Sequence, residues 1–205
     1  MPVGNGKIDR TALTQALLRD RADDLLVVGG LGSATYDLMA EGPSPRNFCL
    51  WGAMGQAAVI GLGLALAQPE KRVLVMTGDG EMLMGLGALA TVADQAPCNL
   101  GILVMDNGLY AETGRQPTAT AGLADLAKVA EGAGFRAAMT IASTDEFDAA
   151  RDMLLGRNGP VLVVAKVAVQ DYGPPADPAT RDGPQQANRF RVDLLGEYDA
   201  MIRID

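Results

Sequence analysis

Four short apolar runs, each followed closely by a turn that contains glycine, constrain the fold of this chain more than any other feature. They lie at residues 25–28, 48–51, 73–76 and 101–105. Strands buried on both faces are typically apolar at successive positions, and segments with helical spacing separate these four runs. The alternation predicts a parallel sheet that is covered by helices on both sides.

Further apolar runs at 137–141 and 161–167 bring the expected sheet to about six strands, mostly parallel, in a three-layer α/β/α fold. The helices are expected at 8–18, 35–40, 53–67, 82–92, 123–130 and 147–155. Residues 1–169 read as one domain. Pro, Gly, Asp and Gln dominate residues 170–205, which we expect to form an extended C-terminal tail with a short helix near 188–195.

The composition excludes several classes of function. The chain has no histidine, so Ser-His-Asp catalysis, His-ligated zinc and imidazole acid–base chemistry are impossible within it. A net charge of −8 without a basic cluster argues against nucleic-acid binding. The longest apolar run, 53–67, is shorter than the roughly 20 residues that a membrane span needs. We therefore expect a soluble, cytoplasmic protein.

Three Gly-x-Gly turns raise the question of a nucleotide-binding loop. Gly30-Leu31-Gly32 lacks the third glycine of the dinucleotide fingerprint, and Gly61-Leu62-Gly63 lies inside an expected helix, where close packing explains it better. Gly78-Asp79-Gly80 follows a strand and opens a helix, but Leu83 replaces the small residue of the fingerprint. An NAD-binding oxidoreductase therefore stays as an alternative.

Asp79 also places a negative charge where the phosphate of a nucleotide would lie, which is favourable only with a cation between them. Asn107 lies 28 residues further on, at the end of the next strand in the expected sheet. Carboxylate, amide and carbonyl oxygens together with phosphate are the ligands that Mg²⁺ prefers. A capping aspartate and a turn asparagine would be the purely structural explanation.

The segment Gly78-Asp79-Gly80, followed by Asn107-Gly108, resembles the cofactor motif of enzymes that depend on thiamine diphosphate (ThDP). The resemblance implies that Asp79, Asn107 and the carbonyl of Leu109 hold Mg²⁺ on the diphosphate. Residues 1–169 would then be the diphosphate-binding domain.

The same resemblance implies a wider set of residues around the cofactor. Met54 would support the bent shape of ThDP, and the carbonyl of Gly52 would accept a hydrogen bond from its 4′-amino group. Ordinary core packing for Met54, and an ordinary turn at residues 30–33, are the structural alternatives. The expected cofactor-binding residues are Gly30, Gly32, Ser33, Gly52, Ala53, Met54, Gly78, Asp79, Gly80, Glu81, Asn107, Leu109 and Tyr110.

Residues 47–135 are similar to a narrower group, the phosphonopyruvate and sulfopyruvate decarboxylases. This implies a carbon–carbon lyase that removes carbon dioxide from a small anionic 2-oxoacid. In the family, a glutamate that activates the cofactor belongs to a separate pyrimidine-binding domain, and this chain is too short for both domains. The resemblance therefore implies a β-type subunit, and no catalytic residue is assigned to it. Its partner would be a pyrimidine-binding α-type subunit, in a hetero-oligomer with at least two copies of each chain.

Two residues are candidates for substrate contacts, Glu112 and Arg115, which lie in the segment after Tyr110. A guanidinium suits a substrate with a carboxylate and a phosphonate or sulfonate, although a solvated surface position is the alternative for both side chains. Another ThDP-dependent lyase or carboligase subunit, and a non-catalytic subunit that keeps the fold, remain as alternatives.

Overall fold

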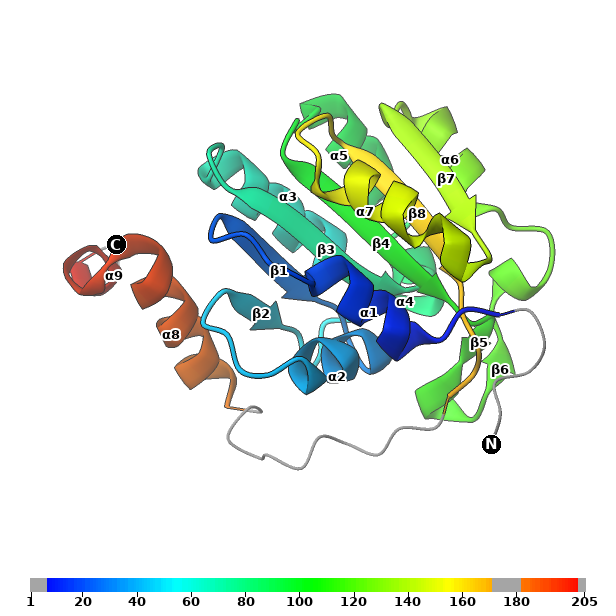
Figure 1. The fold of residues 1–205 in the computed structure, drawn as a ribbon, viewed down its shortest axis with the longest axis horizontal. Helices are drawn as coiled ribbons and strands as arrows, with labels where there is room; N and C mark the ends of the chain where they lie inside the picture. The colour runs from blue at the N-terminus through cyan, green and yellow to red at the C-terminus, as the bar shows by residue number, and fades with distance from the viewer. Residues whose placement is uncertain (1–6, 171–181, 203–205) are drawn as a thin grey trace.

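One six-stranded parallel sheet organises the structure, which is a computed structural model that describes residues 7–170 and 182–202 (Figure 1). The sheet of about six strands predicted from the sequence is confirmed, and all its pairings are parallel. Across the sheet the strands are β2 (Asn47–Cys49), β1 (Leu25–Gly29), β3 (Arg72–Gly78), β4 (Leu100–Asp106), β8 (Val161–Lys166) and β7 (Ala137–Ile141).

Helices cover both faces of the sheet, as predicted (Figure 1). In β3, Val73 and Val75 face one apolar cluster, whereas Leu74 and Met76 face the other, because side chains alternate along a strand. One face is covered by α1 (Arg10–Leu18), α2 (Ser33–Ala40) and α7 (Phe147–Leu155). The other is covered by α3 (Ala57–Ala67), α4 (Asp79–Met84), α5 (Ala88–Gln95) and α6 (Leu126–Ala133).

The strand order places a reversal of the chain next to β1. After β1 the chain adds β2 on one side, and then returns to place β3 on the other side. The carboxyl ends of β1 and β3 therefore send their following helices to opposite faces, and a crevice opens between them. This reversal positions the site described below.

Three of the helices predicted within residues 1–169 differ from the structure by three residues or more, and the one expected at 123–130 is α6, at Leu126–Ala133. The helix expected at 82–92 is two helices, α4 and α5, with a break at residues 85–87. A Cβ at Gly85 would lie 2.1 Å from the carbonyl oxygen of Gly55, so the chain breaks where two backbones touch. The helix expected at 53–67 begins at Ala57, because Ala53 and Gly55 have positive φ angles of 55° and 91° and form a turn.

Gly61 confirms the packing interpretation of the second Gly-x-Gly turn. It lies inside α3, and a Cβ there would come within 2.2 Å of the Val75 side chain. The glycine thus lets α3 lie close to β3. Among the described residues, no helix has both the length and the apolar character to cross a bilayer.

A small hairpin follows β4 and was not predicted. It consists of β5 (Leu109–Tyr110), the 3₁₀ turn η1 (Ala111–Thr113) and β6 (Gln116–Pro117), and it leads into η2 (Ala119–Ala121). A further 3₁₀ turn, η3 (Thr144–Glu146), precedes α7. Strands of two residues carry no periodic signal, so the sequence pattern could not reveal the hairpin.

The C-terminal part of the chain forms α8 (Gly183–Leu195) and α9 (Glu197–Ile202), and α8 lies beside β2 (Figure 1). The helix begins before the expected residue 188, because the side chain of Asp182 accepts a hydrogen bond from Gln185 N and Pro184 occupies the first turn. The extended stretch expected at 171–181 lies outside the described residues.

Candidate functional site

A cavity of about 320 Å³ lies at the carboxyl ends of β1, β3 and β4. The four glycine-containing turns that follow the apolar runs each supply at least one lining residue. The turn after β1 contributes Gly32 and Ser33, and the turn after β2 contributes Met54. The turn after β3 contributes Asp79, and the turn after β4 contributes Tyr110. One ligand in this cavity can therefore touch all four turns.

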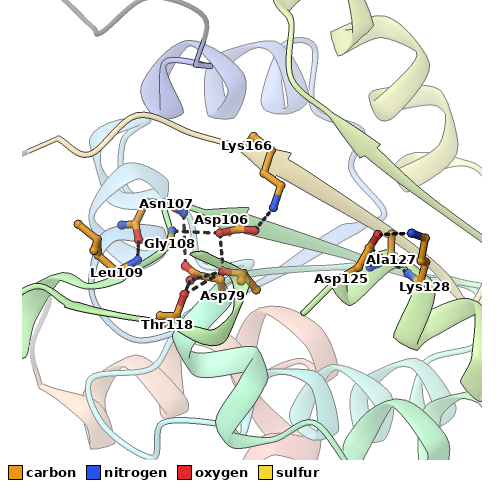
Figure 2. Close-up of polar contacts among 11 residues, drawn as sticks. Asp79, Asp106, Asn107, Gly108, Leu109, Thr118, Asp125, Ala127, Lys128 and Lys166 are labelled. Atoms are coloured by element: carbon orange, nitrogen blue, oxygen red, sulfur yellow. Dashed lines mark hydrogen bonds and ion pairs between the residues drawn. The ribbon is translucent and has the colours of Figure 1, made fainter. Parts of the chain in front are cut away.

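Asp79 is the first residue of α4 and is almost fully buried, with 2 % exposure. Its Oδ2 accepts a hydrogen bond from Thr118 Oγ1 at 2.6 Å and lies 3.0 Å from Thr120 Oγ1. Its Oδ1 accepts only a long contact, 3.4 Å, from the backbone N–H of Asn107 within the described residues. Figure 2 shows Thr118 and the turn of Asn107 directed at this carboxylate. The two threonine hydroxyls thus lie against Oδ2, and Asp79 is part of the cavity lining.

Asp106 lies beside Asp79 at the end of the adjacent strand, since Gly78 and Met105 are partners in the β3–β4 ladder. Its Oδ1 accepts hydrogen bonds from Gly108 N at 3.0 Å and from Thr120 Oγ1 at 2.8 Å. Its Oδ2 forms an ion pair with Lys166 at the end of β8 (Figure 2). Lys166 therefore balances the charge of Asp106.

Asn107 and Leu109 form a tight turn. Asn107 Oδ1 accepts a hydrogen bond from Leu109 N at 2.8 Å, and Gly108 takes a φ of 75° between them. The amide oxygen keeps a second lone pair, and Leu109 N–H fixes its direction. The predicted metal ligands Asp79, Asn107 and Leu109 are therefore neighbours along the wall of one cavity.

The electrostatics of Asp79 favour the binding of a cation. Burial raises the pKa of its carboxyl above the usual range, the hydrogen bond from Thr118 lowers it, and the nearby charge of Asp106 raises it further. Within residues 7–170 and 182–202, Asp79 has no ion-pair partner of its own. A buried carboxylate without a counter-charge is unfavourable, so the donor set fits Mg²⁺ at this position.

Glu81, one of the expected cofactor contacts, also joins two turns of the site. Its Oε2 accepts hydrogen bonds from Thr77 Oγ1 at 2.8 Å and from Leu31 N at 3.0 Å, and the side chain is 3 % exposed. Burial raises its pKa, and the hydroxyl of Thr77 opposes this. Glu81 thus connects the turn after β1 to the end of β3 and is part of the cavity lining.

Two glycines leave room for side chains of the hairpin. A Cβ at Gly80 would lie 2.5 Å from the ring of Tyr110, so this ring packs directly on the backbone of α4. A Cβ at Gly32, which has a φ of 74°, would lie 2.4 Å from the carboxylate of Glu112. Tyr110 and Glu112, both singled out from the sequence, line the cavity through these contacts.

Four other predicted residues lie outside the lining of the cavity. Gly30 is covered by Glu81, whose Oε2 would be 2.0 Å from a Cβ at Gly30. Gly52 and Ala53 are exposed in the turn before α3. Arg115 is exposed in the hairpin with a φ of 61°. Their roles toward a cofactor or substrate stay predictions.

The sequence argument missed the polar contacts that come from distant parts of the chain. Thr118 and Thr120 bind Asp79 across 39 and 41 residues, and Lys166 binds Asp106 across 60. Arg10 also lines the cavity, from the start of α1. No local sequence pattern reveals such pairs. The only indication in the sequence was the position of Lys166 near the end of a predicted strand.

Residues 30–165 match the model of a known family, described as thiamine pyrophosphate enzyme, C-terminal TPP binding domain. Thiamine pyrophosphate is another name for ThDP. This stretch contains nearly all of the cavity, from Leu31 to Gln116, but not Arg10 or Val167. The family match sets aside the nicotinamide alternative for the turn at Gly78.

Several curated relatives resemble the chain. Sulfopyruvate decarboxylase subunit beta of Methanothermobacter thermautotrophicus is 41 % identical over 174 residues, which cover 85 % of this chain and 89 % of that protein. Phosphonopyruvate decarboxylase of Streptomyces viridochromogenes is 41 % identical over 154 residues, which cover 75 % of this chain. The match spans only 38 % of that longer enzyme.

A solved structure agrees with the fold. It is described as that of a thiamin diphosphate-dependent enzyme from Mycobacterium smegmatis, with a TM-score of 0.67 and 27 % identity over 80 % of this chain and 32 % of that one. Sequence and structure comparisons thus select the same group of proteins. The chain belongs to the thiamine pyrophosphate enzyme family and contains its C-terminal TPP-binding domain.

Proposed function

We propose that this chain is the diphosphate-binding subunit of a ThDP- and Mg²⁺-dependent decarboxylase of the cytoplasm. Its substrate is a small anionic 2-oxoacid, with sulfopyruvate and phosphonopyruvate as the first compounds to test. A separate pyrimidine-binding subunit supplies the activating glutamate, and the two chains form a hetero-oligomer with at least two copies of each.

The relatives support the substrate class and the division into subunits. Two of them, from M. thermautotrophicus and Methanocaldococcus jannaschii, are named sulfopyruvate decarboxylase subunit beta, and this chain covers 89 % and 82 % of their lengths. The phosphonopyruvate decarboxylase of S. viridochromogenes is longer, and the matched part is 38 % of it. The chain thus covers most of the length of the relatives named subunit beta, and a smaller part of the longer enzyme.

One observation carries the cofactor proposal, namely the buried carboxylate of Asp79 beside the amide oxygen of Asn107. Thr118 and Thr120 hold Asp79 Oδ2, so that Oδ1 is left to bind a cation. Asn107 Oδ1 and the carbonyl of Leu109 supply further oxygens of the type that Mg²⁺ prefers.

The residues of this chain bind and orient rather than transfer protons. Asp79, Asn107 and Leu109 would hold the metal, and Met54 and Tyr110 would exclude water from the cavity wall. ThDP, when bound, supplies the electron sink that lets carbon dioxide leave a 2-oxoacid. Asp79 and Glu81 both make contacts that build the site. The activating glutamate is assigned to the partner because of the resemblance to ThDP enzymes and because two relatives are named subunit beta.

The test is an assay of the chain co-purified with its partner subunit. We expect release of carbon dioxide from sulfopyruvate or phosphonopyruvate that requires both chains, ThDP and Mg²⁺, and formation of the corresponding aldehyde. Formation of a longer ketone instead would identify a carboligase. Turnover by this chain alone, or by the complex without ThDP, would contradict the proposal.

A further inference from the structure

Lys166 and Asp106 form an ion pair beside the turn that carries two of the proposed metal ligands (Figure 2). Neither residue lines the cavity, so a ligand bound there does not explain the pair. The side chain of Asp106 is 2 % exposed, whereas that of Lys166 is 38 % exposed. A buried carboxylate needs a counter-charge, and within the described residues Lys166 is the one cation paired with Asp106.

The sheet brings this pair together at the ends of two neighbouring strands. Asp106 is the last residue of β4, Lys166 is the last residue of β8, and the two are partners in the parallel ladder. One residue further on, Val167 N donates a hydrogen bond to the carbonyl of Asp106 at 3.0 Å. Paired residues of adjacent strands point to the same face of a sheet. The backbone on both sides of the ion pair is therefore fixed by the sheet.

The other carboxylate oxygen of Asp106 holds the turn of the proposed metal ligands. Asp106 Oδ1 accepts a hydrogen bond from Gly108 N at 3.0 Å. Gly108 lies between Asn107 and Leu109, whose amide oxygen and carbonyl are proposed to bind the metal. Because Lys166 binds Oδ2, the carboxylate is held with Oδ1 directed at the turn.

A single hydroxyl connects Asp106 to the remaining proposed ligand, Asp79. Thr120 Oγ1 lies 2.8 Å from Asp106 Oδ1 and 3.0 Å from Asp79 Oδ2. A hydroxyl has one proton to donate, so it cannot satisfy two ionised carboxylates at once. Lys166 gives Asp106 a donor of its own, and the two carboxylates therefore do not depend on the same proton.

The effect of removing the ammonium group follows from this arrangement. Asp106 would become a buried carboxylate without a counter-charge, which is unfavourable. Its nearest compensation would be the cation of the metal site or water at the surface. Rotation toward either one takes Oδ1 away from Gly108 N, so the turn that carries Asn107 and Leu109 would lose the contact that fixes it.

We propose that Lys166 is a positioning residue of this subunit, which holds the metal-binding turn in place through Asp106. The inference rests on the proposed function and deepens it, because it names a residue outside the cavity that sets the affinity for Mg²⁺. Positioning and simple charge repulsion predict opposite signs. Loss of a nearby positive charge alone would strengthen the binding of a cation, whereas loss of positioning weakens it.

The experiment compares variants of the complete complex of both subunits. Lys166→Met removes the ammonium group, and Lys166→Arg keeps the charge. The double variant Lys166→Met with Asp106→Asn removes both charges, while the amide oxygen can still accept from Gly108 N. The matched control is Lys128→Met, which breaks an exposed ion pair with Asp125 (Figure 2). Thermal unfolding checks that each variant is folded.

The first readout is the Mg²⁺ concentration needed for half-maximal binding of ThDP, measured by calorimetry without substrate. We expect Lys166→Met to raise it roughly tenfold or more, the range for residues that orient metal ligands. Lys166→Arg should need less Mg²⁺ than Lys166→Met, and the double variant should return toward the wild type. Lys128→Met should leave the requirement unchanged.

The second readout is hydrogen exchange of the amides of residues 107–109 in the complex freed of ThDP and metal. These amides should exchange faster in Lys166→Met than in the wild type, because Gly108 N loses its acceptor, and Lys128→Met should match the wild type. If Lys166→Met does not fold, Lys166→Gln replaces it. Glutamine keeps a hydrogen-bond donor without the charge, so the same changes are expected with smaller size.

An unchanged Mg²⁺ requirement in folded Lys166→Met would overturn the proposal. Tighter Mg²⁺ binding would overturn it as well, because Lys166 would then act only as a nearby like charge. A double variant as weak as Lys166→Met would show that Lys166 does not act through Asp106. If the wild-type complex binds no ThDP, the proposed function itself fails, and exchange in the ligand-free complex still decides whether Lys166 holds the turn.

Discussion

Three polar contacts of the cavity meet at Asp79, from Asn107, Thr118 and Thr120. The hydroxyl of Thr118, itself only 5 % exposed, makes the shortest of them. A residue that orients a metal ligand affects how tightly the metal binds, so Thr118 is the first position to test.

Thr118→Val removes this hydroxyl and keeps the shape of the side chain. We expect the Mg²⁺ concentration needed for half-maximal ThDP binding by the complex to rise roughly tenfold or more. Thr118→Ser should restore it, and the exposed Thr140→Val should leave it unchanged. A normal Mg²⁺ requirement in folded Thr118→Val would show that the threonine does not position Asp79.

Asp37 gives a pH dependence with a defined sign. Burial raises its pKa to about 6, although Arg10 attracts its charge, while Asp9 adds a small increase. The folded state therefore keeps a proton on Asp37 that the unfolded state loses near pH 4. The contribution of Asp37 to the free energy of unfolding is therefore fully present below pH 4, and it decreases by roughly 2–3 kcal/mol as the pH rises to 6.

Urea unfolding from pH 4 to pH 7, without cofactor or metal, tests this expectation. The stability of Asp37→Asn should depend less on pH in this interval than that of the wild type, even if its absolute stability is lower. Asp79 and Glu81 also have raised pKa values. Both residues are present in the wild type and in Asp37→Asn, so their effects cancel in the comparison. Parallel pH profiles for the two proteins would contradict the assignment to Asp37.

The break between α4 and α5 fixes the turn that carries Met54. Gly85 touches the backbone of Gly55, so a side chain there would push the turn away from α4. Gly87, two residues on, has open space around its Cβ position and a φ of −61°. The two glycines form a matched pair for testing this contact.

We expect Gly85→Ala to destabilise the protein by about 1–3 kcal/mol, which lowers Tm by several degrees, and to weaken ThDP binding. Gly87→Ala should leave Tm unchanged or raise it slightly. Differential scanning calorimetry of both variants is sufficient. Equal Tm values for Gly85→Ala and the wild type would contradict this prediction, because the turn would then accept a side chain at residue 85 without loss of stability.

Helix α8 protects the edge strand β2. With its amide oxygen directed at Cys49 N, Gln186 accepts a hydrogen bond at 3.1 Å and donates to Cys49 O at 3.2 Å. Phe190 packs edge-on against Phe48 with a centroid distance of 5.5 Å. This pairing closes a sheet edge that would otherwise be open to another chain.

Phe190→Ala should lower the free energy of unfolding by about 3 kcal/mol, because a buried aromatic ring is removed. Tyr198→Ala in α9, where the side chain is 77 % exposed, is the control and should change it little. Chemical denaturation measures both. A similar small effect of the two substitutions would show that α8 does not stabilise the sheet.

Across the whole molecule, the features that could be predicted from the sequence are those that depend on a continuous pattern of residues. The apolar runs indicated the strands, and the resemblance to ThDP enzymes indicated Asp79, Asn107, Met54 and Tyr110, which the structure places in the lining of one cavity. The hairpin after β4 and the break at Gly85 depend on contacts between distant backbones, which leave no local pattern. The same holds for the contacts of Thr118 with Asp79 and of Arg10 with Asp37.

The central claim is that Asp79 holds ThDP through Mg²⁺ in a complex with a second subunit. Native mass spectrometry of the complex captured by this chain from its own cells tests it most directly, with Asp79→Asn and the exposed Asp94→Asn compared with the wild type. Wild type and Asp94→Asn should carry a second subunit with ThDP and Mg²⁺. Asp79→Asn should keep the second subunit and lose both ligands. A wild-type homo-oligomer without ThDP, or an Asp79→Asn complex that retains ThDP and Mg²⁺, would contradict the account.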